Sequence, residues 1–322
     1  DTSDLVGVSP AMRQLRAALD KVAPTDSRVL ISGPPGVGKE VFARQLHSRS
    51  VRANGPFVVL NCAAMTPDRV ESELFGEEGA TRKIGTLEEA HGGTLLLDEV
   101  CDMPLETQGK IVRVLQEQTF TRIGGSAAVQ VDVRVIASTN RDMEEEMAAG
   151  NFRQDLYYRL NVVPIGILPL KERRDDIPAL IEHFMARSAE ISGISPRAVS
   201  SEAMAALQAY EWPGNVRQLR NAVDWILIMA PGQADEPVSV ENLPPDIGSG
   251  TSVSVGWEEG AKLMALPLRE AREIFERQYL LAQVSRFGGN ISRTAEFVGM
   301  ERSALHRKMK SLGVNSGDNM EQ

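Results

Sequence analysis

The sequence predicts an α/β domain built on a parallel β-sheet, followed by a group of helices and then by a separate all-α domain. Short, nearly continuous apolar runs alternate with helical patterns through the first 170 residues, which is typical of a parallel sheet covered by helices on both faces. From Arg174 to about Met229 the pattern is helical only. Helical patterns return at Leu266, in a segment that is basic although the whole chain has a net charge of −9.

Four apolar runs are expected to form the strands of the sheet. They are Val29–Ser32, Phe57–Asn61, Thr94–Asp98 and Val133–Ser138. Each run ends in, or is followed by, polar or glycine residues, which are typical of the turn that closes a strand.

These patterns divide the chain into four expected segments. Residues 1–172 form the α/β subdomain, residues 173–232 a helical lid, residues 233–265 a linker and residues 266–322 the C-terminal domain. The linker is expected because residues 231–260 are rich in Gly, Ser, Pro and acidic side chains with little periodicity. Residues 266–313 hold nine Lys and Arg against five Asp and Glu, and such a basic appendage indicates DNA binding.

The composition is that of a globular protein with an ample core. The 322 residues are 42% hydrophobic and 25% charged, and no run of eighteen apolar residues is present, so no membrane span is expected. The chain starts at Asp1 without a basic and then apolar segment, so we expect a cytoplasmic protein cut from a longer chain. Cys62 and Cys101 are too few for a disulfide framework or a zinc site, and are expected to be buried free thiols.

A glycine-rich loop after the first expected strand predicts a nucleotide site. The loop reads Gly33-Pro34-Pro35-Gly36-Val37-Gly38-Lys39-Glu40. Its glycines allow backbone N–H groups to turn toward phosphates, and Lys39 adds a positive charge beside the β- and γ-phosphates. The helical segment 41–47 then presents its N-terminus to the anion. An ordinary turn is the alternative, and Glu40 stands where a Mg²⁺-binding Ser or Thr is usual, but the strand before and the helix after favour phosphate binding.

Polar residues at the ends of other strands extend this site. Asp98 is expected to hold Mg²⁺ together with phosphates and water, and Glu99 to act as the base that orients the attacking water. An acidic turn is the alternative for this pair. Asn61 either holds Glu99 until the γ-phosphate is sensed or forms a turn, and both readings stay open. Thr139 and Asn140 are expected to touch a γ-phosphate or the attacking water.

The basic C-terminal segment has the spacing of a helix-turn-helix. A long helix over 268–287 is followed by a break at Gly288-Gly289-Asn290, a short helix over 291–298, a turn at Gly299 and a second short helix over 301–312. The spacing buries Leu305, Met309 and Leu312 and leaves one polar face outward. That face is expected to enter or flank the major groove of DNA through Arg302, Ser303, His306, Arg307 and Lys310. A basic hairpin that packs on the rest of the protein is the alternative.

Several longer stretches carry a resemblance to a known family. They are Glu73–Gly76, His91–Val100, Phe152–Asn161, Leu168–Arg174 and Trp212–Leu219. Together they resemble the AAA+ ATPases, and in detail the NtrC family of bacterial enhancer-binding transcription regulators. The resemblance implies an AAA+ P-loop NTPase with a parallel sheet and an α-helical lid, followed by an all-α Fis-type helix-turn-helix domain. In that family the phosphate loop normally ends in Lys-Glu, as it does at Glu40.

The resemblance also implies roles for individual residues. Arg153 and Arg159 stand where the family keeps arginines that reach the ATP of a neighbouring subunit, although both would also suit the surface of an amphipathic helix. Arg217 matches the second-sensor arginine of the lid. Val6 and Gly7 lie in the stretch that matches the adenine pocket, and Asn61 matches the switch asparagine.

One departure from the family limits the functional expectation. Activators of sigma-54 RNA polymerase carry a Gly-Ala-Phe-Thr-Gly-Ala loop after the Leu-Phe-Gly stretch, but here residues 77–85 read Glu-Glu-Gly-Ala-Thr-Arg-Lys-Ile-Gly. This shorter loop is similar to that of NtrX-type response regulators, which carry a receiver domain that would lie upstream of Asp1. We therefore expect regulation by repression or with the housekeeping polymerase. A sigma-54-dependent activator that uses a shortened loop is the alternative, and a protein-unfolding machine fits the basic tail less well.

The expected ligands and partners follow from these assignments. ATP and Mg²⁺ are the cofactors, and slow ATP hydrolysis is expected in a dimer or a ring. The partners are a palindromic operator in double-stranded DNA, RNA polymerase, and a sensor histidine kinase that acts through the receiver domain. Self-association is expected as a dimer through the C-terminal domain and as a ring, such as a hexamer, through the AAA+ domain. No membrane partner is expected.

Overall fold

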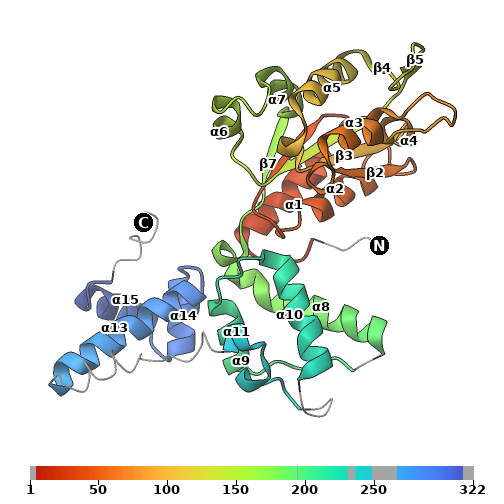
Figure 1. Cartoon of the computed structure of the whole chain (residues 1–322). Helices are drawn as coiled ribbons and strands as arrows, with labels where there is room; N and C mark the ends of the chain where they lie inside the picture. The colour runs from red at the N-terminus through yellow and green to blue at the C-terminus, as the bar shows by residue number, and fades with distance from the viewer. Residues whose placement is uncertain (1–4, 194, 231–235, 249–266, 315–322) are drawn as a thin grey trace. The chain divides into compact units, whose positions relative to one another are not determined.

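The computed structural model describes residues 5–193, 195–230, 236–248 and 267–314. The chain divides into two compact units (Figure 1). The first unit comprises Asp1–Leu5 and Pro10–Pro169, and the second comprises Val6–Ser9 and Leu170–Gln322.

The first unit contains a five-stranded parallel sheet in the order β2-β3-β6-β1-β7. The strands are β1 (Val29–Ser32), β2 (Phe57–Asn61), β3 (Thr94–Asp98), β6 (Arg134–Thr139) and β7 (Val163–Gly166). Asn61 pairs with Asp98, and Ser32 pairs with Thr139, so the polar carboxyl ends of these strands lie along one edge. The predicted α/β fold with a parallel sheet is confirmed.

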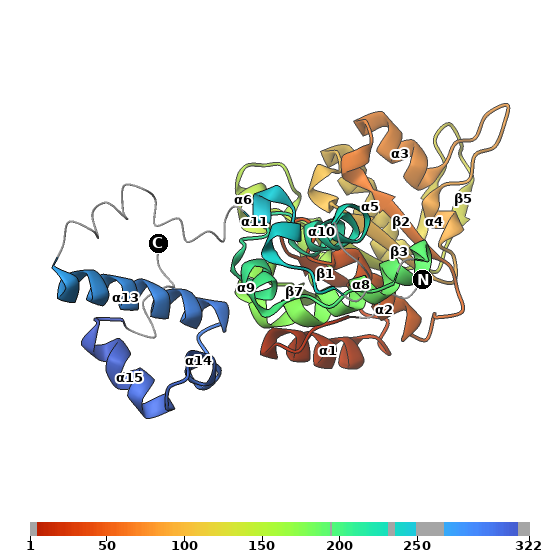
Figure 2. The same ribbon diagram turned by 90° about the horizontal axis from the view of Figure 1, so that it is seen from below.

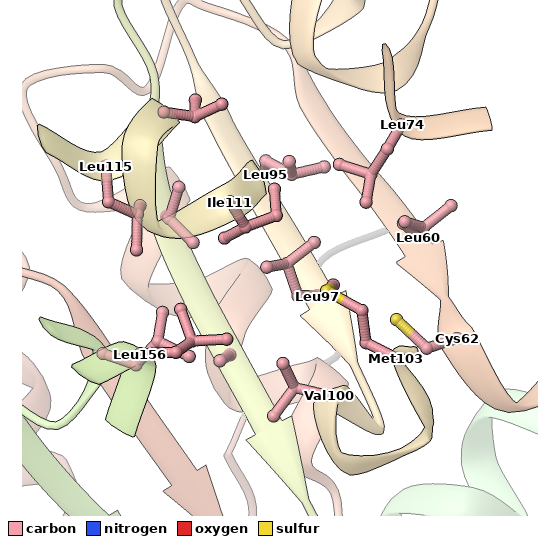
Figure 3. Close-up of a cluster of buried hydrophobic side chains, with 14 of the residues drawn as sticks. Leu60, Cys62, Leu74, Leu95, Leu97, Val100, Met103, Ile111, Leu115 and Leu156 are labelled. Carbon is pink, nitrogen blue, oxygen red and sulfur yellow. The ribbon is translucent and has the colours of Figure 1, made fainter. Parts of the chain in front are cut away.

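Helices cover both faces of this sheet because successive side chains of a buried strand alternate between two cores. Leu96 of β3 packs in one cluster, whereas Leu95 and Leu97 pack in the other. The Leu96 face is covered by α1 (Pro10–Val22) and α2 (Lys39–Ser48). The opposite face, shown in Figure 3, is covered by α3 (Pro67–Phe75), α4 (Thr86–Glu89), α5 (Leu105–Glu117) and α7 (Gln154–Leu160). The turn η1 (Cys62–Ala64), the turn η2 (Val100–Asp102) and helix α6 (Met143–Ala148) complete the connections.

Three strands were not expected from the sequence. Strand β7 contains Pro164, which lacks a backbone N–H and weakens a strand pattern, but β7 lies at the edge of the sheet, where proline is tolerated. Strands β4 (Thr119–Thr121) and β5 (Ala128–Gln130) form an antiparallel pair outside the main sheet, and each is too short to show an alternating pattern. The strand expected at Val133 begins one residue later, at Arg134.

The second unit begins with a helical lid. It consists of η3 (Leu170–Glu172), η4 (Arg174–Asp176), α8 (Ile177–Ser192), α9 (Ser201–Ala209) and α10 (Asn215–Met229) around a buried Trp212. The expected linker 233–265 lies in part outside the described residues, at 233–235 and 249–265. Its described part forms η5 (Val240–Asn242) and α11 (Pro245–Gly248), and it buries Val238, Leu243 and Ile247 in the lid core. Residues 236–248 therefore pack against the lid, with their apolar side chains buried in the lid core.

The C-terminal helices have nearly the expected bounds. Helix α13 spans Leu268–Arg286, α14 spans Ile291–Val298 and α15 spans Arg302–Ser311 (Figure 2). The side chain of Asn290 caps α14 by accepting from the Arg293 amide at 3.2 Å, and Gly299 turns the chain with a φ of 71°. A small core holds the three helices together and contains Leu280, Ala295, Leu305, Met309 and Val314. The helix-turn-helix architecture is confirmed.

Two findings follow from the composition. Both cysteines are free and buried, and burial together with the Asp98 charge raises the pKa of the Cys62 thiol to about 12. Cys62 is therefore expected to be unreactive near neutral pH.

Within the described ranges, no helix has both the length and the apolar character that crossing a bilayer requires.

Candidate functional site

The glycine-rich loop connects β1 to α2 in a conformation that depends on glycine. Gly36 and Gly38 have positive φ angles of 78° and 107°, which side chains rarely adopt. At Gly33 an added Cβ would lie 2.7 Å from the carbonyl oxygen of Ile167, so this position has no room for a side chain. Helix α2 starts directly after Gly38, so the positive end of the helix dipole faces the loop.

Lys39 is the charged group of this loop. Its side chain is only 7% exposed, and its ammonium donates to the Gly33 carbonyl at 2.8 Å and to the Pro34 carbonyl at 3.3 Å. The same Nζ lies 3.4 Å from Oε1 of Glu99. A buried ammonium requires such acceptors, and together they hold its charge beside the loop and the end of β3.

Asp98 and Glu99 lie where β3 ends. Oδ1 of Asp98 accepts a hydrogen bond from the Ser138 hydroxyl at 2.5 Å, which fixes this carboxylate against the end of β6. Glu99 has a φ of 54°, unusual for a residue with a side chain, and its Oε2 accepts from the Asn140 amide at 3.1 Å. The structure thus brings Lys39, Asp98, Glu99 and Asn140 together at one edge of the sheet.

The other polar residues at this edge are engaged locally. Asn61 uses its side-chain oxygen to accept from the Ala63 amide at 3.0 Å, which is the turn-forming bond that the sequence left open. Thr139 is fully buried, and its hydroxyl accepts from the Arg141 amide at 3.0 Å. The Thr139 hydroxyl also lies 3.2 Å from Sγ of Cys101.

The donor set at this edge fits a magnesium ion shared with phosphates. Mg²⁺ in nucleotide sites usually takes one or two carboxylates and fills its remaining positions with phosphate oxygens and water. Asp98 supplies such a carboxylate, and its second oxygen is not used by the Ser138 bond. Among the described residues, no cluster of three or more His, Cys, Asp or Glu could hold a metal by itself.

Arg153 lies immediately before α7, and Arg159 lies in its last turn. Arg153 is the residue before this helix, and its Nε and Nη2 donate to the two oxygens of Asp155 at 3.0 and 2.8 Å. This exposed pair raises the pKa of Arg153 and lowers the pKa of Asp155. Arg159 is half-buried in the last turn of the helix. Burial lowers the pKa of Arg28, and the nearby charge of Arg159 lowers it further.

Val6, Gly7 and Arg217 belong to the second unit. Val6 packs against the lid core, and the neighbouring chain is fixed by Asp176, whose Oδ1 accepts from the amides of Val8 at 2.6 Å and of Ser9 at 2.7 Å. Arg217 is exposed in the first turn of α10.

The expected DNA-contact residues share the exposed face of α15. All five are exposed, whereas Leu305 and Met309 on the opposite side are buried; the exposed set is Arg302, Ser303, His306, Arg307 and Lys310. Lys308 is not part of this face, because its ammonium lies 2.7 Å from Glu276 of α13 and lowers the pKa of that carboxyl.

Two residues near these groups were missed by sequence reasoning. Ser138 donates a hydrogen bond to Asp98 and fixes it. The sequence could have identified Ser138, because it stands at the polar end of an expected strand. Asp155 holds the Arg153 guanidinium, and its spacing of two residues from Arg153 gave no signal, because pairs at that spacing do not face each other inside a helix.

Three protein families match consecutive stretches of the chain. The Sigma-54 interaction domain matches residues 5–166, and the AAA+ ATPase lid domain matches residues 171–255. The Fis family of bacterial regulatory proteins matches residues 271–312.

Individual proteins and solved structures match the chain across all three of these stretches. The nitrogen assimilation regulatory protein NtrX of Azorhizobium caulinodans is 60% identical over 313 residues, which is 96% of this chain and 69% of that protein. Crystal structures of NtrX from Brucella abortus in complex with ADP and with ATP are both 57% identical, with TM-scores of 0.84 and 0.85. Each match covers 97% of this chain and 70% of the NtrX chain.

Proposed function

The chain belongs to the NtrX-type response regulators of the NtrC family, and we propose that it is a DNA-binding regulator of transcription that binds and slowly hydrolyses ATP. The observation that carries the proposal is the meeting of Lys39 with Glu99 beside the glycine-rich loop, 3.4 Å apart. Crystal structures of NtrX from Brucella abortus in complex with ATP and with ADP support nucleotide binding by this chain.

The triphosphate would occupy the loop between Gly33 and Lys39. The backbone N–H groups of the loop and the N-terminus of α2 would bind the phosphates, and Lys39 would exchange its carbonyl partners for phosphate oxygens. Asp98 would hold Mg²⁺, which supplies charge neutralisation between the phosphates. Val6, Gly7 and Arg217 are proposed to contact the nucleotide, and Thr139 and Asn140 to contact its γ-phosphate side.

Hydrolysis would depend on Glu99 and on a second subunit. Glu99 is held between Lys39 and the Asn140 amide, so its carboxylate is oriented by two groups and can accept a proton from water. Arg153 and Arg159 are proposed to reach the ATP of a neighbouring subunit, where a guanidinium accelerates phosphoryl transfer by roughly 10³–10⁵. Asn61 is proposed as a switch that would have to leave its bond to the Ala63 amide to reach Glu99.

The exposed face of α15 is proposed to bind the major groove of a palindromic operator. The protein would bind as a dimer through its C-terminal domain, with Arg302 and Arg307 able to read guanine and Lys310 able to contact phosphate. Ser303 and His306 complete the face. A sensor kinase acting through a receiver domain would control the protein in a two-component system.

Regulation is proposed to proceed without the sigma-54 contact loop. Residues 77–85 form a turn that is closed by backbone hydrogen bonds. Glu77 forms an antiparallel bridge with Lys83 and a parallel bridge with Ile123. Gly76 has a φ of 73°, and an added Cβ there would lie 2.3 Å from the Lys83 carbonyl oxygen. Arg122 holds the turn by ion pairs to Glu78 at 2.8 Å and to Glu88 at 2.7 Å. Because these contacts hold the turn in place, the turn supports regulation without a sigma-54 contact, either by repression or with the housekeeping polymerase.

Hydrolysis is tested with Glu99→Gln and Lys39→Ala over a range of protein concentrations. We expect the Glu99→Gln variant to bind ATP as the unaltered chain does and to lose hydrolysis by roughly a hundredfold or more, because a general base contributes 10²–10⁴. Lys39→Ala should weaken binding about tenfold or more and should also lose hydrolysis. Unchanged hydrolysis in the Glu99→Gln variant would contradict the assigned role.

The polymerase assignment is tested by transcription in vitro from a promoter that carries the bound operator. We expect ATP and the regulator to alter transcription by the housekeeping holoenzyme and to leave open-complex formation by the sigma-54 holoenzyme unchanged. Activation of the sigma-54 holoenzyme would instead support the alternative, a regulator that uses its shortened loop.

A further inference from the structure

A fully buried glutamine joins the turn that carries Glu99 to the loop that carries Arg153. Gln108 lies on α5 and has no exposed surface. Around it, the apolar side chains of this face of the sheet pack closely, and Val100 and Met103 of the turn point into the same cluster as Ile111 (Figure 3). A polar amide is costly in such surroundings unless its hydrogen bonds are made.

The side-chain hydrogen bonds of Gln108 all go to backbone groups of two other segments. Nε2 donates to the Met103 carbonyl at 2.8 Å and to the Asn151 carbonyl at 3.1 Å. Oε1 accepts from the Arg153 amide at 2.9 Å. One rigid side chain therefore spans two segments that are far apart in the sequence.

The first segment is the tight turn after β3. Glu99 is the residue before η2 and Met103 the residue after it, and the Asp102 amide donates back to the Glu99 carbonyl at 3.0 Å. The second segment ends at Arg153, the residue before α7, which is preceded by the buried Phe152. A displacement of either segment would break at least one buried bond of Gln108 and leave a buried polar group unpaired, which is unfavourable.

We infer that Gln108 is a positioning residue that couples the hydrolytic turn of one subunit to the arginine that the same subunit offers to its neighbour. The inference rests on the proposed function, in which Glu99 acts in its own subunit and Arg153 acts on the next. Gln108 fixes the position of the Arg153 backbone relative to the turn that follows Glu99. It thereby lets the state of one nucleotide site set the position of the arginine at the adjacent site.

The test uses mixed assemblies, in which the donated arginine is measured separately from the subunit's own site. Subunits with Arg153→Ala keep Glu99 but lack the arginine, and subunits with Glu99→Gln keep the arginine but lack the base. Hydrolysis in the mixture above that of the Arg153→Ala variant alone then reports Arg153 donated by the second variant to the first. The same mixture is prepared with the double variant Glu99→Gln/Gln108→Met, in which methionine keeps the volume but makes none of the three bonds.

We expect the double variant to complement Arg153→Ala roughly ten- to hundredfold less well than Glu99→Gln alone, because a displacement near 1 Å costs about that much. Its own affinity for an ATP analogue should stay within about twofold of the Glu99→Gln value, which a general loss of structure would not allow. The matched control is Gln118→Met on the Glu99→Gln background. Gln118 is half-buried beyond the other end of α5 and accepts from the Val133 amide at 3.2 Å, so this control should complement fully.

Equal complementation by the double variant and by Glu99→Gln would overturn the inference and leave the proposed function standing. No complementation by Glu99→Gln itself would overturn the proposed exchange of arginines and the inference with it. If Gln108→Met does not fold, Gln108→Glu replaces it. That variant keeps an acceptor for the Arg153 amide but loses both donors, so it should also complement poorly, and full complementation would again refute the coupling.

Discussion

One histidine connects the phosphate-loop helix to the start of strand β3. His47 of α2 is buried, and its Nε2 donates to the Gly55 carbonyl at 3.1 Å. Its Nδ1 lies 2.9 Å from the Thr94 hydroxyl of β3, which donates to the neutral ring. Burial lowers the pKa of His47 below its usual value of 6.5, and the nearby positive charge of Arg134 lowers it further, against the opposing effect of the Gly55 carbonyl.

The lowered pKa predicts a pH dependence of stability. Below pH 6.5 the unfolded chain protonates His47 while the native state keeps it neutral, so stability is present above this pH and is lost as the pH falls toward the native pKa. We expect His47→Gln to reduce the slope of the unfolding free energy in this range by up to about 1.4 kcal/mol per pH unit. Urea denaturation between about pH 7.5 and pH 5 measures the slope, with His183→Gln as the control. Identical slopes for the His47→Gln variant and the unaltered chain would contradict the argument.

The sequence predicted which side chains lie together where residue type and spacing alone marked the candidate site. The glycine-rich loop after a strand, and Asp98 and Glu99 at a strand end, are patterns that mainly indicate a phosphate site. The structure brings Lys39 of the loop within 3.4 Å of Glu99. Gln108 could not be predicted, because a glutamine on an amphipathic helix normally faces solvent, and its partners are backbone groups that only the fold brings near. Asn61 had two compatible readings, and the structure contains the local one.

At the scale of elements, the C-terminal helices depend on very few buried side chains. Leu305 of α15 has no exposed surface and packs with Leu280 and Met309. A core of this size leaves little stability in reserve, since stability grows with the buried area.

Leu305→Ala should therefore unfold or loosen the DNA-binding helices. Such truncations cost about 2–5 kcal/mol, which is comparable with the whole stability of a small domain. We expect operator binding in a gel-retardation assay to be lost while binding of an ATP analogue is retained. The control Ile228→Ala truncates a side chain that is 70% exposed on α10 and should change neither. Retained operator binding by Leu305→Ala would show that the small core does not support the DNA-binding face.

Element boundaries were predictable where the apolar run was uninterrupted and its ends were marked. Strands β1, β2 and β3 and helix α14 have the expected bounds because caps and glycines mark their ends. Strand β7 was missed because Pro164 interrupts its pattern, and the β4–β5 pair because three-residue strands show no period. The packing of residues 236–248 was missed because Val238, Leu243 and Ile247 follow no helical or strand period.

At the scale of the whole molecule, the acidic chain carries a basic C-terminal segment. The net charge is −9, whereas residues 266–313 have four more basic than acidic side chains. Affinity for DNA should therefore come from this segment and should be limited by repulsion from the rest.

Operator affinity should fall steeply with salt. Phosphate contacts release counterions, and a dimer that makes 6–10 of them loses roughly 10³–10⁵ in affinity between about 50 and 200 mM salt. Lys310→Ala should lower the slope by roughly one unit for each phosphate that the shortened side chain no longer reaches, without changing sequence preference. Anisotropy titrations with a labelled operator at several salt concentrations measure both quantities. A flat salt dependence would exclude the assigned face of α15.

The central claim is that the loop around Lys39 and the acidic pair at 98–99 act on a single triphosphate. The most direct measurement is calorimetric titration of the whole chain with Mg²⁺ and a non-hydrolysable ATP analogue. We predict one site per chain, with the affinity reduced about tenfold or more by Lys39→Ala, because a hydrogen bond to a charged group contributes about 1.5–3 kcal/mol. Lys21→Ala, an exposed lysine of α1, is the control and should bind as the unaltered chain does. Equal affinities in all three proteins, or no heat of binding in the unaltered chain, would contradict the account.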